Sequence, residues 1–395
     1  MTGKEDSLTV VGGRLITDSG IIENGMIILR GGLIVHVGAR ETGLGPDGKV
    51  IDARGSYVSP GFIDLHVHGA AGGNFLEGGR EAVTRIAAAH ARYGTTGLLA
   101  TLGMAPLESI EKGITRLREV VAAGDGGNIL GINLEGPYLN PVRCGAHPVN
   151  HLRKPDRDEL SALLDLAGGC VKIVTLAPEL EGARELIELL RERAIVPAAG
   201  HSSASLEEAR SAFSAGVCYA THLFNGMSGV HHRDPGLAAA VLMDKRVTAE
   251  LIVDGIHVHP LMAKMALMLK GARGIVLVTD CMVALDSGAD EFVIGGQRVS
   301  LRGGAPCLDD GTLCGSILTM NRAIMNMRRY TGAPLEEIIA LATINPARVL
   351  GLDGQKGALA PGRDADLVIF DDDLAVKTTV INGAIVHNTL ELVEC

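Results

Sequence analysis

The chain has 395 residues and carries 36 basic and 46 acidic side chains, which gives a net charge of −10. An apolar fraction of 47% is enough for a large core, and together with 52 glycines and no Trp it excludes disordered, collagen-like and coiled-coil proteins. The acidic balance argues against nucleic acid and anionic membranes as partners.

The chain shows no sign of an export or membrane segment. The N-terminal sequence MTGKEDSLTV has charges where the apolar stretch of a signal peptide would lie. No uncharged apolar run approaches the ~20 residues of a membrane-spanning helix. Seven cysteines without a CxxC spacing do not indicate a disulfide framework in a chain of this length. We therefore expect a soluble, cytoplasmic protein.

The two ends of the chain are predicted to be rich in β-strands. Short apolar runs alternate with glycine turns near the start, as at residues 8–11 and 33–37. Near the end, an apolar run at 376–381 is followed by the turn pair NG, which is typical of a hairpin. Chain termini often lie close together. We therefore predict a small β-sandwich domain formed by residues 1–58 and 352–395.

The middle of the chain, residues 59–351, has a different sequence pattern. Short apolar or β-branched runs alternate with amphipathic helical patterns, many of which end at Gly. Eight strand–helix pairs of this length predict a (β/α)8 TIM-like barrel, with a doubly wound parallel sheet as the alternative. The expected strands are residues 62–68, 97–101, 129–135, 171–177, 195–201, 217–222, 247–254 and 275–280.

Side chains able to bind a metal recur at the C-terminal ends of these expected strands. In a barrel these ends meet on one face, where barrel enzymes have their active sites. Nitrogen and oxygen ligands together indicate one divalent metal ion or a pair of ions. The candidate ligands are His66, His68, Glu135, His201, His222 and Asp280.

Each candidate also has an ordinary structural interpretation. His201 could simply precede a helix, His222 could be a hydrogen-bonded core histidine, and Asp280 could cap a helix. Two observations favour the metal: the histidines of an HxH pair on a strand point to the same side, and Glu135 ends an apolar run, where an unpaired carboxylate is costly. Their joint position at strand ends strengthens every one of these assignments.

Seven motifs together resemble the amidohydrolase superfamily and, more narrowly, the N-acetylglucosamine-6-phosphate deacetylases: PGFIDLHVHG, NLEGPYLN, GAHP, GHSSAS, THLFNGM, DGIHV and VTD. The resemblance runs through nearly the whole chain. Many amidohydrolases bridge two metals with a carbamylated lysine at the end of strand four, but this strand ends in TLAPE, without a lysine. The resemblance implies that Glu135 takes that role.

The resemblance implies hydrolysis of the acetamide of N-acetyl-D-glucosamine 6-phosphate to D-glucosamine 6-phosphate and acetate. It implies one or two divalent cations per subunit, with Zn²⁺ preferred over Fe²⁺, Mn²⁺ or Co²⁺, and a homodimer. Three alternatives remain: the same reaction on N-acetylgalactosamine 6-phosphate, a cyclic amidase of the superfamily, and a barrel that has lost catalysis. The absence of a lysine at the end of strand four argues against a cyclic amidase. The complete set of candidate ligands argues against a barrel that has lost catalysis.

Catalytic and substrate-binding roles follow from the same comparison. Asp280 is the expected general base, which later returns the proton to the leaving nitrogen. His147 is expected to hydrogen-bond the acetyl carbonyl or a sugar hydroxyl, and Arg233 to bind phosphate; the alternatives are a loop histidine and a surface ion pair with Asp234. Cys144 stands where we expect a basic residue before GAHP. The expected substrate contacts are Ala146, Asn225, Gly226, Arg233, Asp254, Gly255, Ile256, His257, Leu313, Cys314 and Gly315.

Overall fold

The computed structural model describes residues 7–40, 48–103, 105–124 and 127–394. The chain divides into two compact units. The first comprises Met1–Asp64, Ala88–Gly97 and Met320–Cys395, and the second comprises Leu65–Ala87 and Leu98–Thr319. Among the described residues, no helix has both the length and the apolar character needed to cross a membrane.

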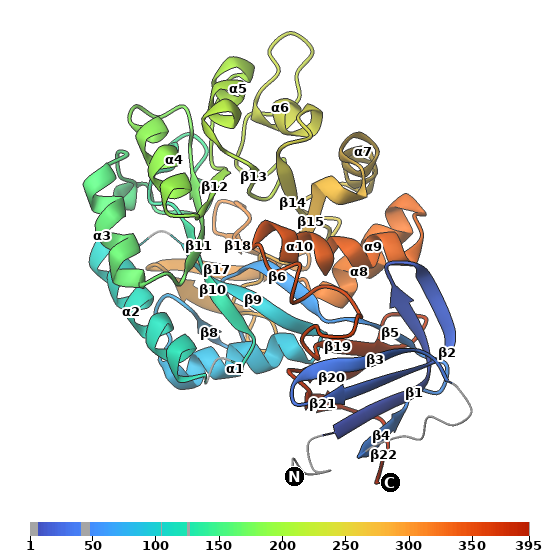
Figure 1. Cartoon of the computed structure of the whole chain (residues 1–395). Coiled ribbons are helices and arrows are strands. Elements are labelled where there is room, and N and C mark those ends of the chain that lie inside the picture. The colour runs from blue at the N-terminus through green and yellow to red at the C-terminus, as the bar shows by residue number, and fades with distance from the viewer. Residues whose placement is uncertain (1–6, 41–47, 104, 125–126, 395) are drawn as a thin grey trace. The chain divides into compact units, whose positions relative to one another are not determined.

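Both ends of the chain supply the sheet of the first unit, which confirms the predicted β domain built from the two termini (Figure 1). Leu15, Ile27, Val58 and Ile369 are among the side chains buried in its core. The predicted hairpin turn is present, and Asn382 and Gly383 both have positive φ, as a tight two-residue turn requires. In the described residues the sheet consists of β1 (Ser7–Thr17), β2 (Gly20–Arg30), β3 (Leu33–Ala39), β4 (Lys49–Asp52), β5 (Tyr57–Pro60), β19 (Leu367–Phe370), β20 (Val376–Ile381), β21 (Ala384–Asn388) and β22 (Leu392–Glu394).

The second large sheet is a nearly closed barrel of parallel strands. Its strands follow one another in chain order, and a parallel bridge between Val67 and Cys281 brings the first strand to the end of the last. A doubly wound sheet would reverse its strand order at the middle, so this order excludes that alternative. The barrel strands described are β6 (Phe62–Val67), β9 (Thr95–Leu102), β10 (Ile129–Glu135), β11 (Val171–Leu176), β12 (Val196–Ala199), β13 (Tyr219–Ala220), β14 (Thr248–Ile252) and β15 (Ile275–Val278).

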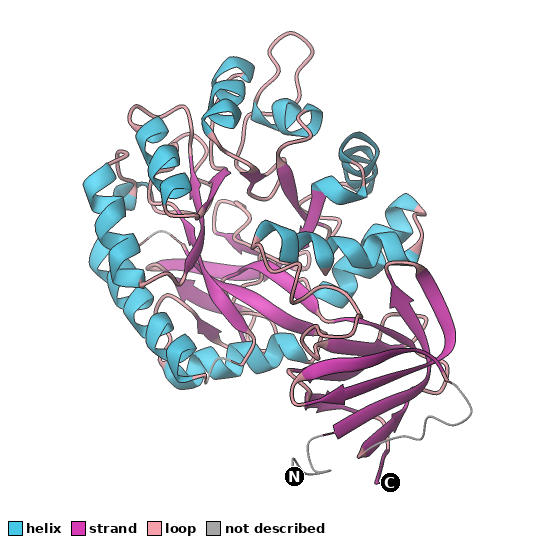
Figure 2. Cartoon of the chain, in the orientation of Figure 1, coloured by secondary structure: helices cyan, strands magenta, loops and turns pink. Residues whose placement is uncertain are grey.

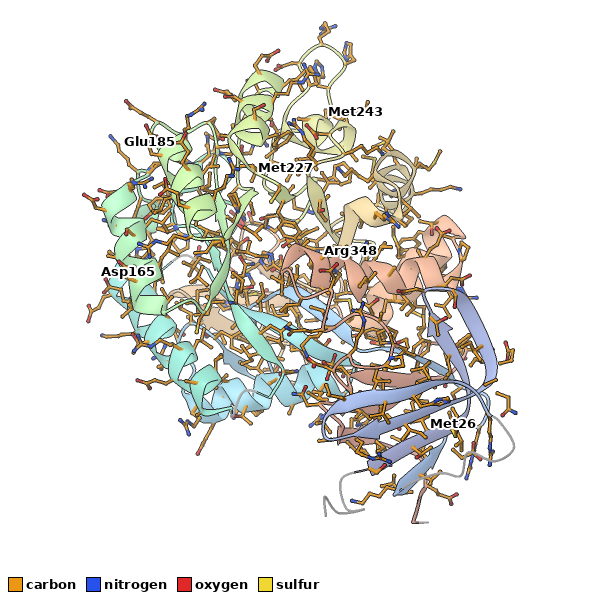
Figure 3. All side chains as sticks on the ribbon, in the orientation of Figure 1. Met26, Asp165, Glu185, Met227, Met243 and Arg348 are labelled. Atoms are coloured by element: carbon orange, nitrogen blue, oxygen red, sulfur yellow. The ribbon has the colours of Figure 1, made fainter. Side chains whose placement is uncertain are left out.

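Helices alternate with these strands, as Figure 2 shows in cyan and magenta. The local sequence sets their bounds: α5 begins with a capping box between Ser205 and Glu208 and ends at Gly216. Exposed charges lie on the outer helices, for example Asp165 on α3 and Glu185 on α4 (Figure 3). The helices between barrel strands are α1 (Arg80–Ala91), α2 (Leu107–Ala123), α3 (Arg157–Ala167), α4 (Ala183–Glu192), α5 (Leu206–Ala215), α6 (Leu237–Met243) and α7 (Pro260–Lys270).

Several further elements were not predicted from the sequence. An antiparallel sheet of β16 (Glu291–Ile294), β17 (Gln297–Arg302) and β18 (Ala305–Leu308) follows the last barrel strand, and it packs around Met282, Val299 and Cys314. A short hairpin of β7 (Gly69–Ala70) and β8 (Gly73–Asn74) follows β6. After the antiparallel sheet come α8 (Met320–Thr331), α9 (Leu335–Leu341) and α10 (Ile344–Val349), which group with the first unit.

Candidate metal centre and active site

The structure brings all the candidate ligands together in the second unit, at the ends of the barrel strands. His66 lies in β6, Glu135 is the last residue of β10, and Asp280 lies two residues after the end of β15. His201, His222 and Asp280 have φ values of 46°, 28° and 50°. Such left-handed conformations are unfavourable for residues other than glycine and tend to occur at functional sites. Three of the predicted ligands therefore lie on strained backbone.

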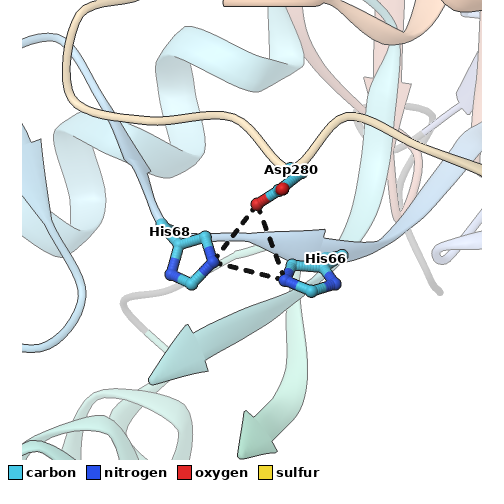
Figure 4. Close-up of side chains that lie close together, drawn as sticks. All are labelled: His66, His68 and Asp280. Carbon is cyan, nitrogen blue, oxygen red and sulfur yellow. Dashed lines mark hydrogen bonds and ion pairs between the residues drawn. The ribbon is translucent and has the colours of Figure 1, made fainter. Parts of the chain in front are cut away.

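One group of ligand atoms consists of His66, His68 and Asp280 (Figure 4). The two Nε2 atoms are 3.2 Å apart. Asp280 Oδ1 lies 3.2 Å from His68 Nε2 and 3.6 Å from His66 Nε2. All three ligand atoms lie within 4.8 Å of one another, so a single ion between them would reach each one.

A second group is centred on Glu135. Its Oε1 lies 3.0 Å from the Nε2 atoms of both His201 and His222, and those two nitrogens are 3.1 Å apart. Its Oε2 lies 3.2 Å from His68 Nε2 and 3.3 Å from His147 Nε2. The Glu135 carboxylate therefore faces both groups. His147, which the sequence predicted only as a substrate contact, also lies in direct contact with this candidate ligand.

The hydrogen bonds of the second group show that it suits a cation. His201 Nδ1 lies 2.8 Å from the carbonyl oxygen of Arg143, and His222 Nδ1 lies 3.1 Å from that of Asn225. A carbonyl only accepts, so each Nδ1 carries the proton and each Nε2 of a neutral ring presents a lone pair. Two lone pairs and a carboxylate oxygen then converge on one point. Their mutual repulsion is relieved by a shared cation, and N and O donors of this kind fit a divalent transition metal.

The pKa shifts describe how the metal-free site holds its charges. Burial by itself would lower the pKa of His68, but Asp280 and Glu135 outweigh burial and raise it to about 9. Burial by itself would raise the pKa of Glu135. The neighbouring His66 and His147 outweigh burial, so the pKa of Glu135 lies well below its usual range. His201 behaves differently, because burial lowers its pKa to about 4. The pKa values of His66 and His222 are also raised by neighbouring carboxylates that outweigh burial, so without a metal the protons on His66, His68 and His222 balance the carboxylates.

A cavity of about 310 Å³ opens onto these groups. Its size is in the range of small-molecule sites. It is lined by five of the candidate ligands, whereas His66 lies fully buried outside its wall. Eight further predicted residues also line it: Ala146, His147, Asn225, Gly226, His257, Leu313, Cys314 and Gly315.

Two positions in this lining, 226 and 315, can be occupied only by glycine. Gly226 and Gly315 have φ values of 57° and 62°. A Cβ on Gly226 would lie 2.8 Å from His201 Nδ1, and one on Gly315 would lie 2.7 Å from the carbonyl oxygen of Asp280. Both backbones therefore approach the ligand residues more closely than any side chain would allow.

Four of the predicted substrate contacts do not line the cavity: Arg233, Asp254, Gly255 and Ile256. Asp254 instead orients its neighbour, since its Oδ2 lies 2.6 Å from His257 Nδ1 and its Oδ1 accepts from the backbone N–H of His257. Arg233 is exposed on the loop before α6. Among the described residues, the cavity lining contains no Lys or Arg.

The cysteines beside the cavity are not activated as nucleophiles. Burial raises the pKa of Cys144, whose Sγ lies 3.3 Å from the carbonyl oxygen of Pro141. Burial, together with Asp280 and Glu135, raises the pKa of Cys314 to about 12. Both thiols therefore stay protonated, which argues against covalent cysteine chemistry at this site.

Sequence reasoning missed some residues around the site. Glu250 is fully buried in β14 and contacts His66; as a charge inside an apolar run, it carried the same signal as Glu135. The lining also includes Asn74, Glu77, Gln297 and Thr312. Gln297 Nε2 donates to the carbonyl oxygen of Ala146 over 2.8 Å, which joins the unpredicted sheet to the GAHP loop.

Comparison with known proteins agrees with this geometry. Residues 57–386 match the amidohydrolase family. The chain is 38% identical to N-acetylglucosamine-6-phosphate deacetylase of Bacillus subtilis, covering 96% of this chain and 97% of the relative. It is 36% identical to N-acetylgalactosamine-6-phosphate deacetylase of Escherichia coli O157:H7, covering 94% and 97%.

Solved structures give the same result. A mutant of N-acetyl-D-glucosamine-6-phosphate deacetylase from Mycobacterium smegmatis, in complex with N-acetyl-D-glucosamine-6-phosphate, superposes with a TM-score of 0.91 at 34% identity, over 98% of this chain and 100% of that one. These matches extend over almost the whole length of both partners. The chain therefore belongs to the amidohydrolase family and, within it, to the N-acetylglucosamine-6-phosphate deacetylases.

Proposed function

We propose that this chain hydrolyses the acetamide of N-acetyl-D-glucosamine 6-phosphate, giving D-glucosamine 6-phosphate and acetate. The observation that carries the proposal is the meeting of Glu135 with the lone pairs of His201 and His222 at a cavity that Asp280 also lines. The two relatives described above are named as deacetylases of N-acetylated amino-sugar 6-phosphates, which supports this substrate class. Acetate release from this substrate, measured beside metal content per chain, tests the proposal.

We propose Zn²⁺ as the resident ion, with Fe²⁺, Mn²⁺ or Co²⁺ as alternatives. Glu135, His201 and His222, whose ligand atoms lie 3.0 to 3.1 Å apart, would hold one ion, with His147 beside Glu135. His66, His68 and Asp280 would hold a second, and the Glu135 carboxylate faces both groups. A divalent cation held there supplies Lewis acidity, which activates water as a nucleophile and polarises a carbonyl.

Asp280 is the proposed general base. Burial would raise its pKa, but His66 and His68 outweigh burial and lower it to about 2, so the carboxylate is ionised at neutral pH, as a base must be. It takes a proton from water as the water oxygen bonds to the acetyl carbon. The same proton then passes to the amide nitrogen as the carbon–nitrogen bond breaks, which releases the neutral amine and acetic acid. The acid loses its proton, which came from the same water, to leave acetate.

The remaining cavity residues are proposed to orient the substrate. His147 lines the cavity and its Nε2 lies 3.3 Å from Glu135 Oε2, which supports a hydrogen bond from His147 to the acetyl oxygen. His257, held by Asp254, and the amide of Asn225 offer donors to the sugar or to its phosphate. Gly226, Leu313 and Gly315 would lie against the sugar.

The phosphate needs a cation that the described lining does not provide. Arg233 lies outside the cavity on an exposed loop, close in sequence to Val230 and Met243, which are 55% and 72% exposed. The family resemblance implies a homodimer in which some phosphate contacts cross the interface, and the exposed position of Arg233 is compatible with such a contact. Replacing Arg233 by Ala should raise KM for phosphorylated substrates at least tenfold. An equal loss on unphosphorylated N-acetylglucosamine would contradict this role.

A second candidate substrate is N-acetylgalactosamine 6-phosphate, which the 36% identical relative from Escherichia coli O157:H7 supports. The two sugars differ in the orientation of one hydroxyl. Comparison of kcat/KM for the two epimers decides between them, and a ratio above about tenfold corresponds to more than about 1.4 kcal/mol of discrimination in the transition state.

A further inference from the structure

Glu250 is a buried carboxylate that the proposed reaction does not use. It lies in β14, its side chain is 0% exposed, and it is not part of the cavity lining. Its Oε2 lies 3.0 Å from His66 Nδ1 and 3.0 Å from the backbone nitrogen of His222. Its Oε1 has no hydrogen-bond partner among the described residues.

A carboxylate buried in this way at Glu250 lowers the stability of the fold if the side chain only fills space in the barrel. A carboxylate deprived of water needs hydrogen bonds or a counter-charge. In the described part of the chain no Lys or Arg pairs with Glu250, and its donors are a histidine ring and one backbone N–H. A glutamine or a leucine would fit the same space with a smaller penalty, so a role of the charge itself must outweigh that penalty.

The hydrogen bond to His66 sets the tautomer of that ring. A carboxylate accepts from Nδ1–H, which leaves the lone pair on Nε2. His66 Nε2 is the atom that faces His68 Nε2 at 3.2 Å and Asp280 Oδ1 at 3.6 Å. The negative charge behind the ring also makes Nε2 a stronger electron donor to a cation in front of it.

The same oxygen also holds the second group of ligands. His222 has a φ of 28°, so its backbone is strained, and its N–H points at Glu250 Oε2. His222 Nε2 in turn lies 3.0 Å from Glu135 Oε1. A single oxygen atom thereby fixes one ligand from each group, so a change at Glu250 disturbs both.

We propose that Glu250 is a positioning residue that presents His66 Nε2 and the His222 ring to the metal ions of the active site. This inference rests on the proposed function only in assuming that the two groups bind divalent metal. Glu250 neither contacts substrate nor transfers the reacting proton. Its replacement should therefore lower metal affinity and kcat, while KM stays close to that of the parent chain.

The matched variants are Glu250→Gln, which keeps the shape and removes the charge, and Glu250→Leu, which also removes the acceptor. Thr378→Val is the control, because Thr378 is fully buried in β20 of the first unit and loses one hydrogen bond, at 2.7 Å to Asn388, whereas all the candidate ligands lie in the second unit. Thermal unfolding of the metal-free proteins shows whether each variant folds. If the leucine variant does not fold, the glutamine variant alone carries the test.

The main measurement is competition for Zn²⁺ against a chromogenic chelator, which needs no substrate. Glu250→Gln is expected to weaken Zn²⁺ binding 10- to 100-fold, and added Zn²⁺ should restore much of its kcat. Affinity within twofold of the parent chain, or an equal loss in Thr378→Val, would overturn the inference. If the parent chain binds Zn²⁺ but deacetylates no amino sugar, the proposed function fails, while the affinity comparison still decides the role of Glu250.

Discussion

Removal of the metal should make the stability of this protein depend on pH in the alkaline range. In the metal-free chain the pKa of His68 is raised from 6.5 to about 9 by Asp280 and Glu135, which outweigh the effect of burial. A histidine with a raised folded-state pKa adds stability that is fully present below pH 6.5. That stability is lost as the pH rises through 9.

The size of the effect follows from this shift. At about 1.4 kcal/mol per pKa unit, the change from 6.5 to about 9 corresponds to about 3 kcal/mol of unfolding free energy. With an unfolding entropy of about 2 cal/mol/K per residue, a chain of this length unfolding as one unit would lose about 4 °C in Tm. His66 acts in the same direction, because Glu135, Glu250 and Asp280 also raise its pKa despite burial.

The assay is differential scanning calorimetry from pH 6 to 9.5 on chelator-treated and Zn²⁺-loaded protein. A coordinated histidine is deprotonated throughout this range, so the loaded protein should lack this slope. The comparison also cancels other titrations, such as that of Lys270, whose pKa burial lowers to about 8. His68→Gln should flatten the slope of the metal-free protein, whereas His232→Gln, on the exposed loop, should leave it unchanged. Identical slopes with and without Zn²⁺ would refute the reasoning.

Three further results are expected. Asp280→Asn should lower kcat by about 10²- to 10⁴-fold with KM retained; acetate release near the parent rate would remove Asp280 as the base. Zn²⁺ titration in weak buffer at pH 7 should release about two protons, one each from His66 and His68, if their group binds an ion. Glu135 and Asp280 also raise the pKa of His222 despite burial, so filling the Glu135 group alone would release at most the single proton of His222. Lys270→Met should cost about 2 to 4 kcal/mol in chemical unfolding, because Nζ donates to the carbonyl oxygens of Val241, Asp244 and Val247; a loss below about 0.5 kcal/mol would show that these bonds contribute little.

The barrel and the meeting of its ligands could be predicted from sequence because both follow from topology. Parallel strands joined in chain order place all their C-terminal ends on one face, whatever the details of the loops. The strand predicted at 129–135 is β10, residue for residue, and that predicted at 275–280 contains β15. Residues at or within two positions of a strand end, such as Glu135 and Asp280, are therefore located by the strand prediction alone.

The positions of loop residues could not be predicted in this way. Arg233 is separated from β13 by more than ten residues, and nothing in the local pattern determines whether such a loop turns into the cavity or away from it. The sheet at 291–308 has paired glycines at both turns, 295–296 and 303–304, all with positive φ. That pattern indicates hairpins, but not that Gln297 would reach the GAHP loop.

The charged residues of the site stabilise one another, so the role of each depends on its neighbours. Glu135, Asp280 and Glu250 bring three buried carboxylates close together, where any one of them without a partner would be strongly destabilising. The histidines around them tolerate this in two ways, by holding protons when the metal is absent or by sharing divalent cations when it is present. His201, with a pKa of about 4, is the exception, because it is neutral in either case. The cluster thus exchanges protons for metal around one histidine that does not titrate near neutral pH.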